Sequence, residues 1–455
     1  MPRPANMAIA LSHTRRVAPV GHAGCAWRWE ENLRSGSRGA ASSSSSAPHA
    51  AVASHHRSLA NTASAAVGAT VASAGSSRAR RLRRSRHLYG GPFARSVVTA
   101  AVSAGSELER DGVATSLRLP EKFRFSADDP SDSFLTCLEE HGVVVLEGAL
   151  LADEVADIKD LIWDWLQGLG VDRNNLETWR IEGGRWPQDN TSEGGSTGVV
   201  ATCGASQTMA AWRVRAAPRV RRAFERLWNT TDLLTSMDAL ILWRPWRQKP
   251  PTIPETWRTC SAWLHLDQNI VKEPSKLLVQ GLVALTPADA ESTGGFVLVP
   301  GGHRKDAQDR LRTRLIADGE LAGRKLAKKR GDFMVMPADD DVYCQSVVVP
   351  LKPGDLVLWD SRVPHASEPA QGLEDQRAAR FSVKPSESLL RMAVPVCMAP
   401  RSMAEDLPGF VQWRQEAVAK GIATKHWPHK MRPQGSPAGD GYKPPVLTDV
   451  MRRLL

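Results

Sequence analysis

The sequence predicts a mainly β, α+β protein: a double-stranded β-helix, or jelly roll, with flanking helices, after a disordered leader. Two observations predict this fold. From Ser236 onward the chain consists of short apolar runs separated by Pro/Gly turns, at intervals typical of a sandwich or jelly roll. In addition, three polar side chains that suit a metal, those of His265, Asp267 and His365, each stand at the end of a predicted strand. A cupin-like core would bring these strand ends together.

The expected strands are short and apolar, and they are bounded by Gly, Pro or Asp: Val143–Leu146, Leu240–Trp243, Val279–Leu285, Phe296–Val299, Phe333–Met336, Leu356–Trp359 and Met392–Met398. The expected helices have apolar residues at helical spacing: Phe134–His141, Leu151–Leu169 and Arg219–Trp228. Residues 180–208 are rich in Gly, Asn and Ser, which predicts a long loop. Residues 305–330 are charged and are expected to form a helical insertion. We expect both segments to shape the mouth of a pocket.

The N-terminal part of the chain has a composition of its own. Residues 1–106 contain fourteen Arg, no Lys and two acidic residues, a net charge of +12 against +10 for the whole chain. An Ala/Ser/Arg-rich leader of this kind is typical of a transit peptide for a plastid or mitochondrion. An unstructured tail on a cytoplasmic protein, or a nuclear signal in Arg80-Arg81-Leu82-Arg83-Arg84, are the alternatives. We expect a linker over 107–131, one domain over 132–430 and a C-terminal tail over 431–455.

Charge and composition exclude several classes of function. Without the leader the chain has a net charge of about −2, so the high pI does not predict nucleic-acid binding by the folded domain. No run of 18 uninterrupted apolar residues occurs, so no transmembrane segment is expected. The six cysteines form no Cys-x-x-Cys pair, which disfavours a structural zinc site.

His265-Leu266-Asp267 carries the strongest chemical signal, together with His365, which follows Asp267 by 98 residues. Two residues apart on a strand, His265 and Asp267 project from the same face. Two histidines and one carboxylate are the protein ligands of facial-triad Fe(II) oxygenases, and they leave positions on the metal open. Downstream, Arg391 suits a dicarboxylate co-substrate through a bidentate ion pair. This pattern predicts an Fe(II)/2-oxoglutarate oxygenase.

Further motifs support the same domain, and together they carry a resemblance. His303 ends a Gly-rich run from Gly294; it could bind metal, but we expect a structural role because the triad is already complete. About two thirds of the chain, from about 132 to 430, resembles the phytanoyl-CoA dioxygenase family. The matching pieces are Glu140–Val145, His265-Leu266-Asp267, Gln280-Gly281-Leu282, Gly294-Gly295, Pro300–His303, Gly354–Asp360, His365 and the strand from Arg391.

The resemblance implies roles for individual residues. His265, Asp267 and His365 are expected to bind Fe(II). Ser367 and Arg391 occupy the positions that hold the far carboxylate of 2-oxoglutarate, with Arg380 as the rival arginine. The implied reaction uses O2, decarboxylates 2-oxoglutarate to succinate and CO2, and hydroxylates a small-molecule or lipid-like substrate.

Several side chains remain open to two interpretations. Gln268 and Asn269 could contact 2-oxoglutarate or substrate, or could make strand-end hydrogen bonds. Trp243 or Trp263 could line the substrate pocket or belong to the core. The cluster His426-Trp427-Pro428-His429 could form a second metal site, although packing of the tail onto the barrel is the simpler expectation.

Two other functions compete with the oxygenase. A non-catalytic jelly-roll protein could retain the triad for a structural metal, and a cupin-like metalloenzyme could work without 2-oxoglutarate. The partner expected in either enzymatic case is a small molecule. No feature of the sequence predicts a particular oligomeric state or substrate.

Overall fold

The computed structural model describes residues 118–455 except 193–194, 247–254, 261–262, 277, 291, 318–331, 338, 370–388 and 405. All of these residues belong to one unit of the chain, 85–455. The predicted leader, the first part of the predicted linker and Arg380 lie outside the described residues. Within the described part, no helix has the length and apolar character needed to span a bilayer.

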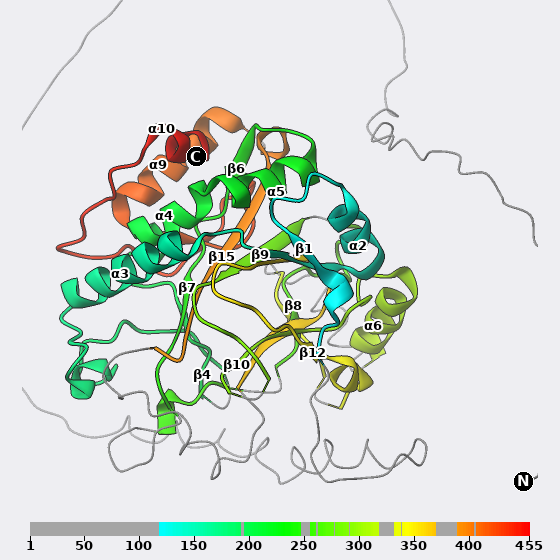
Figure 1. Ribbon diagram of the computed structural model, residues 1–455, viewed down its shortest axis with the longest axis horizontal. Coiled ribbons are helices and arrows are strands. Elements are labelled where there is room, and N and C mark those ends of the chain that lie inside the picture. Colours follow the sequence, from blue (N-terminus) through cyan, green and yellow to red (C-terminus); the bar gives the residue numbers. More distant parts are fainter. Residues whose placement is uncertain are drawn as a thin grey trace, which may run out of the picture. The chain divides into compact units, whose positions relative to one another are not determined.

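Two β-sheets form the centre of the fold (Figure 1). The larger sheet has eight strands: β1 (Arg124–Ser126), β2 (Val143–Glu147), β13 (Leu356–Asp360), β9 (Val279–Ala284), β15 (Arg391–Pro400), β7 (Leu240–Trp243) and β5 (Val199–Val200) in that order, with β6 (Leu233–Thr235) paired to β15. The smaller sheet has five strands, in the order β11 (Met334–Val335), β8 (His265–Leu266), β14 (His365–Pro369), β10 (Gly294–Leu298) and β12 (Val347–Val348). All neighbouring strands in both sheets are antiparallel except β1 and β2.

The central strands of the large sheet are apolar along almost their whole length because both of their faces are covered. Every residue of β13 and of β9 is buried, which is the pattern of strands enclosed on both sides. One side packs against helices. On the other side the small sheet approaches closely enough for the rings of Phe296 in β10 and Trp359 in β13 to lie 4.5 Å apart. The apolar core therefore extends from one sheet to the other.

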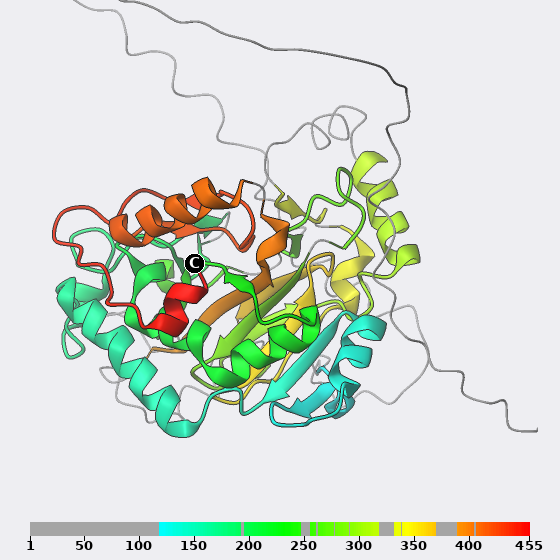
Figure 2. The same ribbon diagram turned by 90° about the horizontal axis from the view of Figure 1, so that it is seen from above.

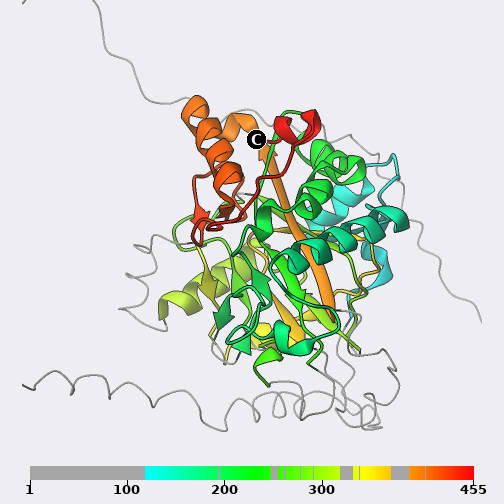
Figure 3. The ribbon, with the colours of Figure 1, turned by 90° about the vertical axis from the view of Figure 1, so that its left-hand side faces the viewer.

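Helices cover the outer side of the large sheet: α2 (Ser133–His141), α3 (Ala152–Gly168), α4 (Met209–Ala216) and α5 (Pro218–Trp228). Figure 3 shows α3, α4 and α5 beside the long strand β15. The side chain of Glu154 accepts a hydrogen bond from the Leu151 backbone N–H at the start of α3 (2.8 Å), satisfying a donor that the helix leaves free. At the end of α2, Gly142 adopts a left-handed conformation (φ 74°), which glycine tolerates best.

The predicted strands and helices are present, with ends shifted by a few residues. Three segments differ from expectation because short strands and scattered apolar residues leave little signal in the sequence. Residues 118–131, predicted as linker, include β1, which joins the large sheet. Residues 180–208, predicted as loop, contain three two-residue strands, among them the edge strand β5. In the charged insertion the expected helix is present as α6 (Lys305–Ala317), and the remainder of the segment up to 330 lies outside the described residues.

The third difference lies in the C-terminal region, of which residues 431–455 were predicted as a tail. The region contains α9 (Leu407–Lys420) and β16 (Ala423–Thr424), which fall within the predicted domain, and β17 (Pro433–Gln434) and α10 (Asp449–Arg453), which fall within the predicted tail. Figure 2 shows both helices lying against the body of the fold. Met451, Leu454 and Leu455 are buried in the main core. These few apolar residues lie among polar ones, so their burial is not evident from periodicity. The end of the chain is an integral part of the domain.

Candidate active site

His265 and His365 meet because they are paired residues of neighbouring antiparallel strands. They lie directly opposite each other in the register of β8 and β14, where side chains of one face come close. Their ring centroids are 4.4 Å apart. Asp267 follows β8 immediately, with its carboxylate oxygens 3.8 Å from His265 Nε2 and 3.3 Å from His365 Nε2. One ligand atom from each of the three residues lies within 4.8 Å of the others, which suits a single metal ion.

Backbone carbonyls orient both histidines. His265 Nδ1 lies 3.2 Å from the carbonyl oxygen of Trp263, and His365 Nδ1 lies 2.9 Å from that of Val363. A hydrogen on Nδ1 satisfies each carbonyl and leaves the Nε2 lone pair free for a metal. The indole of Trp263 also stacks on His265, at 4.6 Å and 14°. The two Nε2 atoms therefore face the same point beside Asp267.

The protonation states also match those of metal ligands. Burial, followed by the neighbouring His365, lowers the pKa of His265 to about 3. Burial acts to raise the pKa of Asp267, but the charge of His426 and the hydrogen bond with His365 outweigh it and hold this pKa well below its usual range. Metal binding requires a neutral imidazole and an ionised carboxylate, and His265 and Asp267 are already in these forms at neutral pH.

A buried cation is hydrogen-bonded to Ser367, two residues after His365, and has no ion-pair partner among the described residues. Arg391, the first residue of β15, is 1% exposed, and its Nη1 donates a hydrogen bond to Ser367 Oγ (2.9 Å). Its guanidinium lies over the ring of Trp243, 4.7 Å from the centroid. Among the described residues no carboxylate is within ion-pair distance, and Nη2 is buried without a partner. Burial lowers the pKa of Arg391 to about 9. Such a site is suited to an anionic ligand.

One cavity of about 480 Å³ contains the triad and Ser367. Both sheets contribute to its walls, with Trp263 and Phe296 from the side of the small sheet and Leu282 and Trp359 from the large one. Asn190 and Thr197, from the segment predicted as a loop at the pocket mouth, also line it. None of the described residues of α6 does so; of the region near the insertion, only Asp332 and Phe333 reach the cavity.

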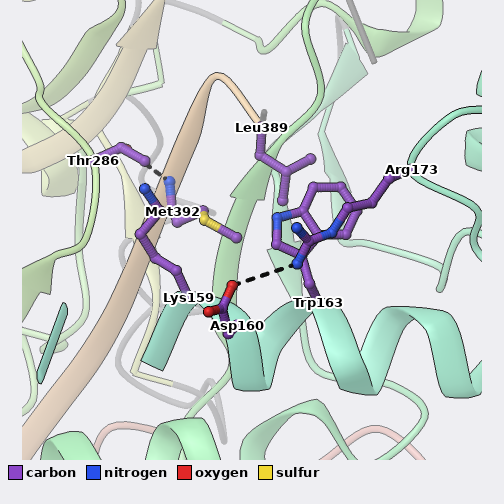
Figure 4. Close-up of a pocket in the computed structure, with 7 residues that line it drawn as sticks. All are labelled: Lys159, Asp160, Trp163, Arg173, Thr286, Leu389 and Met392. Carbon is purple, nitrogen blue, oxygen red and sulfur yellow. Dashed lines mark hydrogen bonds and ion pairs between the residues drawn. The ribbon is translucent and has the colours of Figure 1, made fainter. Parts of the chain in front are cut away.

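A second, smaller cavity of about 170 Å³ lies between α3 and β15 (Figure 4). Met392 lines it, whereas the preceding residue, Arg391, is hydrogen-bonded to Ser367 of the larger cavity. The cation here is already compensated: Arg173 stacks on Trp163, 4.5 Å from the ring centroid, and lies 3.6 Å from Asp160. No candidate metal cluster is found in this cavity among the described residues. The candidate active site is therefore the larger cavity.

The structure corrects one predicted site residue. Gln268 does not reach the cavity: its Nε2 donates to the carbonyl oxygens of Glu273 and Ser275 (2.6 Å each), and its Oε1 accepts from Ser361 (2.6 Å). Because the chain alternates sides, Gln268 points away from the face that Asp267 occupies, and it fixes the following turn. The predicted contact of Gln268 with the cofactor is therefore wrong.

The tryptophans and His303 have distinct positions. Trp263 lines the cavity, whereas Trp243 lies beneath Arg391. His303 stands outside the cavity, with its Nε2 2.8 Å from the carbonyl oxygen of Glu139, in agreement with the structural role expected for it.

Three polar residues at the site were not assigned from the sequence. Gln280, in the buried strand β9, donates from Nε2 to Asp267 Oδ2 (2.8 Å). In the sequence, the only indication of this role is that Gln280 is a single amide within an apolar strand. Asp238 lines the cavity, and burial raises its pKa. His426 places its Nδ1 3.7 Å from Asp267 Oδ2. His426 belongs to the His-Trp-Pro-His cluster of the sequence, but no sequence pattern connects that cluster to Asp267, more than a hundred residues earlier.

Two facing sheets with a His-Asp-His cluster at the cavity between them are the arrangement of a mononuclear, non-haem metal site. Residues 138–378 match the sequence profile of the family described as phytanoyl-CoA dioxygenase (PhyH), which is more than half of the chain. The protein belongs to this family. The family consists of oxidoreductases whose cofactors are Fe(II) and 2-oxoglutarate, and the resemblance expected from the motifs is confirmed.

The individual relatives and solved structures that resemble this chain have low sequence identity to it. The "Ava biosynthesis cluster protein O" of Aspergillus versicolor is 25% identical over 304 residues, which cover 64% of this chain and 83% of that protein. The alpha-ketoglutarate-dependent carbocyclase SnoK from nogalamycin biosynthesis is 18% identical, with 60% and 86% coverage and a TM-score of 0.37. The epimerase SnoN, solved with Fe3+, alpha-ketoglutarate and nogalamycin RO, is 16% identical, with 58% and 82% coverage and a TM-score of 0.37.

Proposed function

We propose that the protein is an Fe(II)/2-oxoglutarate-dependent dioxygenase that hydroxylates a small-molecule or lipid-like substrate and converts 2-oxoglutarate to succinate and CO2. One observation carries the proposal: Arg391, a buried arginine with no ion-pair partner among the described residues, is hydrogen-bonded to Ser367, which lines the cavity that holds the His-Asp-His cluster. The two sheets are then the two walls of a double-stranded β-helix.

In this proposal His265, Asp267 and His365 hold the iron. Two neutral imidazoles and one carboxylate are the donors that Fe(II) oxygenases use, and three protein ligands leave room for co-substrate and O2. Gln280 keeps Asp267 oriented through its 2.8 Å hydrogen bond. Bound Fe(II) and 2-oxoglutarate supply the oxidising chemistry, while the protein positions the reactants and excludes bulk water.

Arg391 and Ser367 are proposed to hold the carboxylate of 2-oxoglutarate that is remote from the metal. A guanidinium can bind a carboxylate through two parallel hydrogen bonds, and Arg391 has one buried, unused nitrogen available. The anion would also compensate the buried positive charge, whose isolation in a low-dielectric interior is costly. Arg380, the rival arginine, lies outside the described residues.

The substrate is proposed to occupy the rest of the cavity. Its walls are largely aromatic and aliphatic near the triad, with Trp263, Phe296 and Phe333, and polar at Asp238 and Lys425. This combination suits a small organic molecule that has an apolar body and a few hydrogen-bonding groups.

Anaerobic titration with Fe(II) and 2-oxoglutarate tests the proposal. We expect a visible metal-to-ligand charge-transfer band in the parent protein, its loss in His265→Ala and its weakening in Arg391→Ala. Exposure to O2 should then release succinate even without substrate, slowly. Metal binding without a band would instead favour a cupin-like enzyme that does not use 2-oxoglutarate, and a band without any succinate release would favour a binding protein.

We also propose that residues 1–106 direct the protein to a plastid or mitochondrion. The support is compositional: many arginines and serines with almost no acidic residues. A fluorescent protein fused after residue 106 should accumulate in one of these organelles, and diffuse or nuclear fluorescence would refute the proposal.

A further inference from the structure

The C-terminal region, which lies beyond the family match at 138–378, reaches back to the candidate metal centre. Lys425, His426, Trp427 and Gln434 all line the cavity that contains the triad. His426 comes nearest to the metal ligands, with its Nδ1 3.7 Å from Asp267 Oδ2. Its other ring nitrogen, Nε2, is buried without a hydrogen-bond partner among the described residues.

The backbone on both sides of His426 is held firmly. Before it, Thr424 is tied to Met237 twice: the Thr424 N–H donates to the Met237 carbonyl (2.7 Å), and its hydroxyl accepts from the Met237 N–H (2.9 Å). After it, Pro428 accepts a hydrogen bond from the buried Arg414 (3.1 Å). The fold therefore fixes where this imidazole lies.

Arg414 links this segment to the rest of the domain. It is fully buried, and it also donates to the carbonyl oxygens of Thr235 and Leu455. Thr235 lies three residues before Asp238, so one guanidinium connects the strand region that carries Asp238 with the loop that carries His426. A buried guanidinium with hydrogen bonds to several segments restricts the movement of the loop that carries His426.

Two neighbouring residues that line the cavity, His426 and Trp427, differ in what else they contact. Trp427 is fully buried against Leu278, Cys397 and Ala399 and provides the apolar contact of the loop. His426 meets Trp427 edge-on, with the ring centroids 4.4 Å apart, and its ring is at the cavity instead of in that apolar cluster. Packing alone would not require a histidine at this place.

Asp267 Oδ2 has polar neighbours from two distant parts of the chain. Gln280 donates to it from β9, and His426 approaches it from the C-terminal loop. The cluster whose candidate ligand atoms all lie within 4.8 Å of one another contains His265, Asp267 and His365 but not His426. His426 is thus placed to act on a ligand rather than to be one.

We propose that His426 is a positioning residue of the metal centre, which acts through Asp267. The Nδ1 side of His426 stabilises the ionised carboxylate of Asp267. Together with Gln280, His426 restricts the orientation of this carboxylate for metal binding. The inference rests on the proposed function in one respect, namely that Asp267 is a metal ligand. Partners of metal ligands of this kind typically account for a 10–100-fold effect on metal affinity.

The affinity of the full-length protein for Mn(II), measured from the electron paramagnetic resonance signal of the free ion, tests this role. We expect His426→Ala to weaken Mn(II) binding by about 10–100-fold. His426→Asn places an amide nitrogen where Nδ1 was and should recover most of the affinity. His429→Ala is the matched control: His429 belongs to the same loop, lies across Trp427 with ring centroids 6.5 Å apart and does not line the cavity, so Mn(II) binding should stay unchanged.

Parent-like Mn(II) affinity in His426→Ala would overturn the inference, as would equal losses in His426→Ala and His429→Ala, which would indicate general disturbance of the loop. Failure to recover affinity in His426→Asn also counts against it. Failure of the proposed function has a different signature: Mn(II) binding that depends on His426, but no charge-transfer band with Fe(II) and 2-oxoglutarate. Mn(II) binding that His265→Ala leaves intact would overturn both.

Discussion

Arg391 and Ser367 join the two sheets across the edge of the cavity. Arg391 begins β15 in the large sheet, Ser367 lies in β14 of the small sheet, and a 2.9 Å hydrogen bond connects Nη1 to Oγ. The bond places a guanidinium in the interior where the described residues provide no carboxylate. A buried charge without compensation opposes folding, so this arrangement is more easily explained by a ligand than by stability.

Replacing Arg391 with methionine should therefore change stability and ligand binding in opposite directions. Without ligand, Arg391→Met should raise the free energy of unfolding by about 1 kcal/mol or more, because an uncompensated charge is replaced by an apolar chain of similar length. Addition of 2-oxoglutarate with Mn(II) should raise the Tm of the parent through mass action and raise the Tm of the variant much less. Urea unfolding and thermal melts measure the two effects.

Arg391→Lys provides the control for charge. It keeps the positive charge but loses the planar pair of donors, so it should not gain stability, and its response to 2-oxoglutarate should be weaker than that of the parent. A methionine variant that is less stable than the parent and still responds to 2-oxoglutarate would show that Arg391 has only a structural role.

Two buried glutamines, Gln268 and Gln280, should have different effects when each is replaced by leucine. Gln280→Leu removes a donor to Asp267, so Mn(II) affinity should fall by about 10–100-fold with little change in unfolding free energy. Gln268→Leu leaves the carbonyls of Glu273 and Ser275 without a partner, which should cost about 1–3 kcal/mol of stability. Its Mn(II) affinity should remain within a few-fold of the parent. If Gln268→Leu weakened metal binding as strongly as Gln280→Leu, the purely structural role of Gln268 would be wrong.

The contrast between these glutamines shows how far the sequence predicts the site. Strand periodicity placed His265, Asp267 and His365 correctly at strand ends, because apolar alternation defines strands and their faces. The same alternation should have assigned Gln268 to the opposite face from Asp267. Adjacency to the triad is the weaker criterion, and of the two interpretations of Gln268 the structure shows local hydrogen bonding.

Contacts between distant segments could not be predicted in the same way. His426 meets Asp267 through the packing of a C-terminal region that has little periodicity, and only the tertiary structure brings the two together. Likewise β5 has only two residues, too few for any pattern to emerge. Local patterns specify elements and faces, whereas the meeting of elements depends on the whole core.

Gly142 offers a test of the junction between α2 and β2. It has φ +74°, and a Cβ there would lie 2.5 Å from His303 Nδ1 and 2.8 Å from Val363 Cγ2. Gly142→Ala should therefore lower the free energy of unfolding by about 2–4 kcal/mol, from left-handed backbone strain and overpacking. Gly148→Ala is the matched control, because Gly148 has a similar φ of +69° with nothing within 4 Å of its Cβ. It should lose about 1–2 kcal/mol. Equal losses in urea unfolding would contradict the predicted clash.

His429 should make the stability of the metal-free protein depend on pH. Burial, followed by the charge of Lys430, lowers its pKa to about 4, whereas an unfolded histidine titrates near 6.5. The folded state thus binds fewer protons than the unfolded state between these values, so this contribution to stability is present above pH 6.5 and is lost as the pH falls through about 4.

His429→Gln should lose less stability than the parent between pH 7 and pH 4, by roughly 1–2 kcal/mol, a value reduced because the ring is partly exposed. Urea unfolding at a series of pH values in the presence of a chelator measures this difference, since bound metal would add its own pH dependence. Parallel stability curves for the two proteins would show that His429 takes up its proton in the folded state as readily as in the unfolded one.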